Sequence, residues 1–257
     1  PEVINATVSP RLDGTKLKLD NLNFSTEYLK SLNKICIVAC GSAYHVGCVA
    51  KYFLEQLTRK PVEVDIASEF RYRNPIINEN TLVIIISQSG ETADSIAALR
   101  EAKLHGSKIV SVVNVVGSTI ASESDYVLYT HAGPEIAVAT TKAYSSQLVI
   151  MYLFGLYLGK MLDTIKDEQI ENIISNLKNL PSQIQSILDR KDDIFSLSEK
   201  YSNYEKIFFI GRNLDYAVCM EGSLKLKEIS YIHSEACAAG ELKHGTISLV
   251  DNSTLVV

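Results

Sequence analysis

The chain has 257 residues, of which 46% are hydrophobic and 21% are charged, as expected for a globular protein with one large domain or two smaller ones. Its net charge of −5 and its lack of any Lys- or Arg-rich run argue against nucleic acid or an anionic membrane as a partner. The five cysteines form no C-x-x-C pair and are typical of reduced thiols in the cytoplasm.

The ends of the chain and its most apolar run indicate where in the cell the protein would be found. No signal peptide is visible, and the apolar run 148–158 is too short to span a bilayer, so it is interpreted as a buried helix. The chain begins without Met, and residues 253–257 resemble the start of a strand. We therefore expect a piece of a longer cytoplasmic protein.

The pattern along the chain predicts an α/β fold of parallel sheets flanked by helices. We expect residues 1–30 to be a linker and a first helix, 31–165 a first subdomain, 166–202 connecting helices, and 203–257 the start of a second subdomain, truncated at the C-terminus. The expected strands are 35–39, 62–66, 82–86, 108–113, 126–129 and 207–210, with an irregular stretch at 67–74 and long helices at 143–160 and 167–200, the latter divided by Pro181. The segment 34–58 is echoed at 206–230, which suggests two similar halves.

The most informative segment is the buried strand 82–86 and the polar turn that follows it. Ser87, Gln88, Ser89, Gly90 and Thr92 lie between that strand and a helix expected to open at about 93. Because a helix N-terminus presents free N–H groups and favours an anion, this turn suits a phosphate monoester such as a sugar phosphate. The alternative is that the Ser and Thr residues merely cap the helix, and this segment alone leaves both interpretations open.

Two further turns carry small hydroxyl residues. Cys40-Gly41-Ser42 stands between the first strand and its helix, and with the first turn it could bring two helix N-termini to one ligand. The run Val138–Lys142, which includes Thr140, precedes the helix at 143–160 and on its pattern is better explained as a helix cap.

Charged residues gather after residue 220. Glu221, Lys225 and Glu228 share one helical face, which fits either a solvated ion-pair stripe or a carboxylate tuned by an ammonium group to act as a general base. The stretch 232–245 shows little helical or strand period and contains His244, so we expect a functional loop. No spacing in it fits a closed zinc site.

The turn 87–92 and the stretch 224–245 closely resemble the isomerase portion of the glucosamine-6-phosphate synthases, or glutamine–fructose-6-phosphate aminotransferases (isomerising), within the wider sugar-isomerase (SIS) superfamily. The similarity also includes 66–73 and 135–143, and so covers most of the chain. The stretch 224–245 is the specific part, since the serine turn is shared more broadly. The resemblance implies two flavodoxin-like SIS halves and a fructose 6-phosphate site.

The resemblance also implies roles for individual residues. Ser87, Gln88, Ser89 and Thr92 would hold the phosphate, while Ser42, Val138 and Thr140 would contact the sugar. Glu228 would move a proton between C1 and C2, Lys225 would position and polarise Glu228, and His244 would open the sugar ring in the neighbouring subunit's site, which implies a homodimer.

No metal or organic cofactor is implied. In the family, a glutaminase domain would lie upstream of Pro1, and the lysine that forms an imine with the sugar would lie beyond Val257. We therefore expect an enzyme fragment that binds a hexose 6-phosphate and transfers protons but is incomplete as a catalyst. The whole enzyme would use glutamine-derived ammonia to make glucosamine 6-phosphate, a precursor of UDP-N-acetylglucosamine.

Two alternatives remain at this stage. One is a related SIS deglycase or isomerase that acts on another phosphosugar. The other is a non-catalytic phosphosugar-sensing module, which would bind its ligand without proton exchange at C1 or C2 and would leave Lys225, Glu228 and His244 without a purpose.

Overall fold

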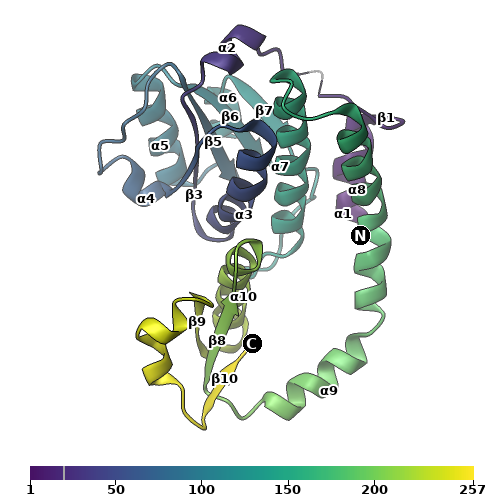
Figure 1. The fold of residues 1–257 in the computed structure, drawn as a ribbon, viewed down its shortest axis with the longest axis vertical. Coiled ribbons are helices and arrows are strands. Elements are labelled where there is room, and N and C mark those ends of the chain that lie inside the picture. Colours follow the sequence, from purple (N-terminus) through teal and green to yellow (C-terminus); the bar gives the residue numbers. More distant parts are fainter. Residues whose placement is uncertain (20) are drawn as a thin grey trace. The chain divides into compact units, whose positions relative to one another are not determined.

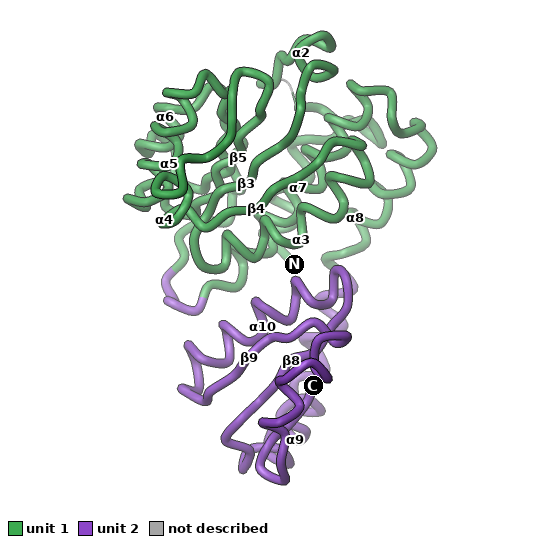
Figure 2. Tube along the Cα trace, turned by 60° about the vertical axis from the view of Figure 1, so that its left-hand side comes forward, with its two compact units in different colours: residues 1–135, 140–181 green, residues 136–139, 182–257 purple. Residues whose placement is uncertain are grey.

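The computed structural model describes residues 1–19 and 21–257. These residues form two compact units, coloured separately in Figure 2. Unit 1 comprises residues 1–135 and 140–181, and unit 2 comprises residues 136–139 and 182–257. Each unit is described by itself.

Unit 1 is built on a five-stranded parallel sheet (Figure 1). The strands are β3 (Lys34–Ala39), β4 (Val62–Ile66), β5 (Thr81–Ser87), β6 (Lys108–Val113) and β7 (Tyr126–Tyr129), in the order β4-β3-β5-β6-β7. Each of these strands was predicted to within a residue at either end. Every residue of β5 is buried, as expected for a central strand covered on both faces.

Helices cover both faces of this sheet. Figure 1 shows α3 (Gly41–Thr58) and α7 (Lys142–Met161) on one face and α4 (Ala67–Phe70) and α5 (Ala93–Leu104) on the other, with α6 (Thr119–Glu123) beside α5. Side chains alternate along a strand, so Ile37 packs towards α3 while Cys36 and Val38 belong to the core beneath α5. The short helix α4 replaces part of the stretch 67–74, for which no regular structure was expected.

The first thirty residues contain more regular structure than a linker and one helix. They form α1 (Glu2–Val8), the 3-10 turn η1 (Ser9–Arg11), a hairpin of β1 (Leu12–Asp13) and β2 (Lys16–Leu17), and most of α2 (Thr26–Ser31). Arg11 donates hydrogen bonds to the carbonyl groups of Thr7 and Tyr129, which fastens this segment to the end of β7.

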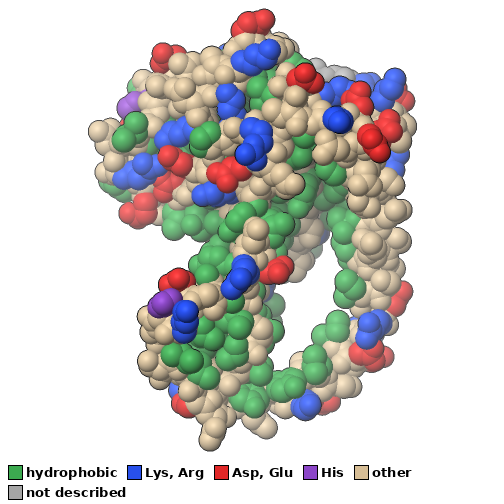
Figure 3. All heavy atoms as spheres, in the orientation of Figure 1, with side chains coloured by type: hydrophobic (Ala, Val, Ile, Leu, Met, Phe, Trp, Pro, Cys, Tyr) green, Lys and Arg blue, Asp and Glu red, His purple; other side chains and the backbone are tan. Residues whose placement is uncertain are grey.

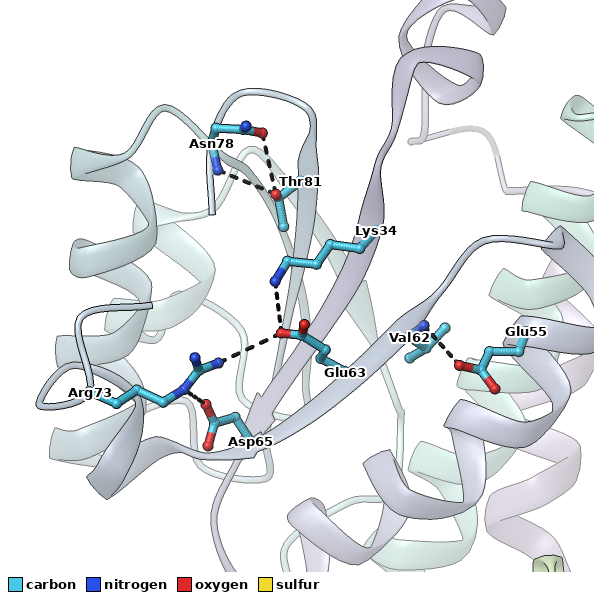
Figure 4. A network of polar contacts seen from close by, with 8 residues as sticks. All are labelled: Lys34, Glu55, Val62, Glu63, Asp65, Arg73, Asn78 and Thr81. Atoms are coloured by element: carbon cyan, nitrogen blue, oxygen red, sulfur yellow. Dashed lines mark hydrogen bonds and ion pairs between the residues drawn. The ribbon is translucent and has the colours of Figure 1, made fainter. Parts of the chain in front are cut away.

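A polar network covers the exposed edge of the sheet along β4 (Figure 4). Lys34 Nζ lies 2.8 Å from Glu63 Oε2, and Arg73 reaches both Glu63, at 3.7 Å, and Asp65. Charged side chains on an edge strand discourage pairing with another chain. The network also folds the segment after β4 back onto that strand.

Unit 2 contains the end of α8 (Asp167–Leu188), then α9 (Lys191–Tyr201), β8 (Lys206–Gly211), α10 (Leu214–Ser230), β9 (His233–Ala238), the 3-10 turns η2 (Leu242–His244) and η3 (Thr246–Leu249), and β10 (Thr254–Val256). Its parallel sheet has the order β10-β8-β9. Unit 1 has the same arrangement in β5-β3-β4, with α3 in the place of α10. This order confirms the predicted resemblance between the segments 34–58 and 206–230.

Two local predictions were wrong. Pro181 does not divide the helix at 167–200, because it lies buried inside α8 and the break falls at Asp189 and Arg190. A proline removes only one helical hydrogen bond, and here the remaining bonds carry the helix through. The stretch 232–245 is not all loop, since 233–238 form the edge strand β9, in which Ser234 and Cys237 are buried.

The surface of the described residues carries charges of both signs, which are interspersed over unit 1 on the face drawn in Figure 3. Apolar side chains are exposed along the end of α8 and α9, among them Ile187, Ile194 and Phe195. Within the residues described, no helix has both the length and the apolar character needed to cross a membrane.

Candidate functional site

The serine turn, residues 87–92, joins the end of β5 to the start of α5. Ser87 is buried at 3% exposure, and its Oγ accepts a hydrogen bond from the Gly90 N–H at 3.1 Å. Ser89 Oγ accepts the N–H of Glu91 at 3.2 Å. A hydroxyl oxygen that accepts a backbone N–H keeps its own proton to donate elsewhere, so Ser89 can still donate to an anion. Ser87 also shares a hydrogen bond with the Thr92 hydroxyl, so these two residues keep one hydroxyl proton between them for an anion.

Thr92 completes the turn as the N-cap residue of α5. Its Oγ1 lies 3.2 Å from Ser87 Oγ, and no side-chain bond from Thr92 caps the helix. The interpretation that these hydroxyls exist only to cap α5 is therefore not supported at Thr92. The turn presents hydroxyl groups and a side-chain amide, that of Gln88, at a helix N-terminus, which is an arrangement suited to phosphate.

The turn is fastened to the segment 114–120, which sequence reasoning did not single out. Asn114 donates its backbone N–H to the Gln88 carbonyl at 3.1 Å, and Ile120 donates to the Gly90 carbonyl at 3.0 Å. Glu91 accepts from both the N–H and the hydroxyl of Thr119. The signal that could have found this segment is Gly117-Ser118-Thr119, another small-hydroxyl run after a predicted strand.

Ser42 lies at the end of the neighbouring strand. β3 pairs directly with β5, and Cys40, Gly41 and Ser42 form the start of α3, with Gly41 at φ +56°. Cys40 Sγ lies 4.0 Å from Ser95 Oγ in α5. The Ser42 turn and the serine turn therefore follow the carboxyl-terminal ends of two adjacent strands, β3 and β5.

Thr140 and Val138 fall in different units. Thr140 belongs to unit 1, where its hydroxyl donates to Glu135 Oε2 at 2.9 Å and the same oxygen accepts the Ala143 N–H at 3.1 Å. Val138 groups with unit 2 and is 91% exposed. Glu135 was not predicted, because it lies seven residues before the start of α7 at Lys142, outside the positions at which a local pattern marks a helix cap.

On α10, Lys225 lies between two carboxylates. Its Nζ is 3.5 Å from Glu221 Oε1 and also donates a hydrogen bond to Glu228 Oε2. The side chains of Glu221, Lys225 and Glu228 are only 7%, 16% and 26% exposed. A solvated ion-pair stripe would be open to water, so this burial argues against that interpretation.

His244 lies apart from this cluster in the hydrogen-bonding network. It ends η2, is exposed, and its backbone N–H donates to the Glu241 carbonyl at 2.9 Å. In the described part of the chain, no hydrogen bond or ion pair joins His244 to Lys225 or Glu228. The residues predicted for the site are therefore divided between the units: unit 1 contains Ser42, Ser87, Gln88, Ser89, Thr92 and Thr140, and unit 2 contains Val138, Lys225, Glu228 and His244.

Comparison with known protein families identifies the family to which this fold belongs. The SIS domain family matches residues 28–157 and 200–257, which include the serine turn, α10 and His244. The chain therefore belongs to the SIS domain family.

Relatives within that family are more specific. The chain is 55% identical, over all of its length, to the glutamine–fructose-6-phosphate aminotransferases [isomerizing] of Caldanaerobacter subterraneus subsp. tengcongensis and Clostridium tetani. It spans 42% of the length of each of these relatives. A solved structure, the C-terminal domain of glucosamine-fructose-6-phosphate aminotransferase from Francisella tularensis, is 40% identical and superposes with a TM-score of 0.95 over 100% of this chain and 72% of the other.

Proposed function

We propose that the chain is the sugar-phosphate isomerase part of a glutamine–fructose-6-phosphate aminotransferase. It would bind fructose 6-phosphate and, with ammonia derived from glutamine, take part in its conversion to glucosamine 6-phosphate. Support comes from the names of the relatives that are 55% identical over the whole chain. The chemistry of the two groups of residues agrees with that activity.

One observation carries the chemical part of the proposal, namely the position of Lys225 between Glu221 and Glu228. Isomerisation moves a proton between C1 and C2, which needs one group that can accept the proton on one carbon and return it to the other. Glu228 is proposed as that base. Lys225 is proposed to hold the Glu228 carboxylate in place and to stabilise its charge until it takes the proton.

The serine turn is proposed as the anchor of the substrate phosphate. Ser89 retains a proton to donate, Ser87 and Thr92 retain one hydroxyl proton between them, Gln88 adds an amide, and the α5 N-terminus adds its dipole. Ser42, Val138 and Thr140 are proposed to contact the sugar, with the Thr140 hydroxyl directed by Glu135. Binding through the phosphate would leave the reactive carbons free for the proton-transfer groups.

Three further features belong to this proposal. His244 would open the sugar ring in the site of a neighbouring subunit, so the protein would act as a homodimer. A glutaminase domain would precede the chain in the full-length protein. The cytoplasm is the proposed location, and the five cysteines, which are all free thiols in the described residues, fit a reducing compartment.

The chemical role is tested with Glu228→Gln in the full-length protein, with Asp215→Asn as a control because Asp215 is an exposed carboxylate on the same helix. We expect Glu228→Gln to slow exchange of the C1 and C2 protons with deuterated water by at least about 100-fold and to leave the Kd for fructose 6-phosphate within about twofold. Asp215→Asn should change neither quantity. Unchanged exchange in Glu228→Gln would remove Glu228 as the base.

The subunit arrangement is tested by complementation. Chains that carry Glu228→Gln are mixed, unfolded together and refolded with chains that carry His244→Ala, so that mixed dimers form. If His244 serves the neighbouring site, a mixed dimer contains one site with both residues intact, and activity should recover to about a quarter of the wild-type value, as half of the dimers are mixed and each has one good site of two. No recovery would place both residues in the site of a single chain.

A further inference from the structure

We propose that Glu91 is a positioning residue for phosphate binding, because it holds the serine turn and the start of α6 together in the arrangement that the phosphate requires. The inference rests on the proposed function in one respect, since it assumes that the serine turn binds the substrate phosphate. It adds a residue outside the set expected to touch the ligand, and it gives the segment 114–120 a role.

The contact is specific in its geometry. Glu91 Oε1 accepts the backbone N–H of Thr119 at 2.7 Å, and Glu91 Oε2 accepts the Thr119 hydroxyl at 2.8 Å. Both carboxylate oxygens are thus engaged by one residue that lies 28 positions away in the sequence. These two bonds, the backbone bond first, lower the pKa of Glu91, so the group stays ionised and able to accept both donors.

The same two segments are joined at neighbouring points. Ile120 donates its N–H to the Gly90 carbonyl at 3.0 Å, and Ser118 stands directly against Gly90. Asn114 donates to the Gln88 carbonyl at 3.1 Å. The turn is therefore hydrogen-bonded along its length to the segment 114–120, which follows β6. Among the described residues, Glu91 is the only member of the turn whose side chain forms a hydrogen bond to that segment.

An anion site gives a reason for this arrangement. Residues 88–92 form no helix or strand, so their N–H and hydroxyl groups point correctly only if outside contacts fix the backbone. A carboxylate beside a phosphate would also repel it. When Glu91 points at two donors on Thr119, its charge is compensated on the side of the turn that faces α6.

The test measures KM and kcat for fructose 6-phosphate in the full-length protein that carries Glu91→Ala, Glu91→Gln or Thr119→Val. We expect Glu91→Ala to raise KM about tenfold with kcat within about twofold, because binding is weakened and the proton-transfer groups are untouched. Glu91→Gln can still accept the N–H and can donate to the Thr119 hydroxyl, so its KM should rise less than about threefold. Thr119→Val removes one donor, and combining it with Glu91→Ala should add nothing to the effect of Glu91→Ala alone.

A matched control is Glu123→Ala on α6, the helix that begins at Thr119. Glu123 accepts two hydrogen bonds from Arg100, at 2.6 and 2.9 Å, and so ties α6 to α5 instead of to the turn. Its removal should leave KM within about twofold of the wild-type value. If Glu123→Ala raises KM as much as Glu91→Ala does, Glu91 acts only through the stability of α6 and the inference fails.

Ser89→Ala separates this inference from the proposed function. If Ser89→Ala raises KM and Glu91→Ala does not, the phosphate anchor stands and Glu91 has no positioning role. If neither variant changes KM, the phosphate lies elsewhere and both proposals fail together. If Ser89→Ala and Glu91→Ala both raise KM while Glu91→Gln keeps KM near the wild-type value, the side chain at position 91 acts through its hydrogen bonds to Thr119, as proposed.

Discussion

Gly90 and Ser118 lie so close together that no side chain fits between them. A Cβ atom on Gly90 would overlap the side chain of Ser118, and Gly90 has φ +68°, in the region that L-residues rarely adopt. The glycine is therefore required twice, by the backbone and by its neighbour. The glycine allows the Gly90 N–H to donate to Ser87 Oγ while Ser118, next to α6, packs against the turn.

We predict that Gly90→Ala destabilises unit 1 by about 3 kcal/mol or more, from backbone strain together with overpacking. The measurement is urea unfolding followed by a probe in unit 1. Gly117→Ala is the control, because Gly117 has φ +76° in the same segment but has nothing within 4 Å of the added Cβ. It should cost only about 1–2 kcal/mol.

The steric part of that prediction can be isolated with Ser118→Gly. In Gly90→Ala/Ser118→Gly the clashing hydroxyl is gone, so the loss should fall to about the level of Gly117→Ala. Ser118 also caps α6 through the Ala121 N–H at 3.4 Å, but glycine is nearly as good at that position. A double variant no more stable than Gly90→Ala would show that Ser118 is not the obstacle.

The cluster on α10 gives a second prediction. Lys225→Met should destabilise unit 2 by about 2 kcal/mol, because the buried carboxylate of Glu221 loses the cation 3.5 Å away. Lys225→Met/Glu221→Gln should be more stable than Lys225→Met, since the buried charge is then removed as well. The control Lys227→Met, at an exposed position of the same helix, should stay within about 0.5 kcal/mol of the wild type. Equal losses in all three variants would contradict the buried ion pair.

The sequence was sufficient for features that rest on local chemistry. β5 could be predicted because five apolar residues in a row need burial on both faces, and the serine turn because Gly90 and the hydroxyls follow that strand. The helical face of Glu221, Lys225 and Glu228 followed from spacing, but its burial did not. Only packing could decide whether that face met water.

What the sequence did not reveal depends on contacts between distant residues. The bond from Thr119 to Glu91 joins positions 28 residues apart, and nothing in either local pattern announces it. β9 was missed because its buried residues, Ser234 and Cys237, are small and three positions apart, so they give no apolar alternation. The helix break predicted at Pro181 was wrong because a proline is a strong local signal for the end of a helix, although a packed helix can continue through it.

Cysteine reactivity provides a third prediction. Cys36 in β3 is fully buried, and burial raises the pKa of its thiol to about 12. Because the thiolate is the reactive form, iodoacetamide at pH 8 should leave Cys36 unmodified in the folded protein while half-buried Cys40 reacts. Mass spectrometry of digested samples, with and without urea, reads both sites. Modification of Cys36 as fast as Cys40 without denaturant would contradict the packing of the sheet.

The loop before β10 gives a prediction about pH. Asp251 accepts hydrogen bonds from the hydroxyl and the N–H of Ser253, from Lys206 and from Thr254, and these bonds hold its pKa well below the ordinary value of 3.8. A carboxyl with a lowered folded-state pKa stabilises the fold fully above the unfolded value, and that contribution is lost as pH falls below about 3.8.

Asp251→Asn should therefore lower the thermal midpoint of unit 2 at pH 6 and reduce its dependence on pH below 4, because the unfolded state no longer takes up a proton at this position. The control Lys206→Met removes a single donor, at 3.1 Å, and leaves the Ser253 and Thr254 bonds in place. It should therefore weaken the acid dependence without abolishing it. Thermal melts from pH 6 to pH 2.5 measure both effects, and an acid limb in Asp251→Asn as steep as that of the wild type would show that other carboxyl groups dominate the acid unfolding of this unit.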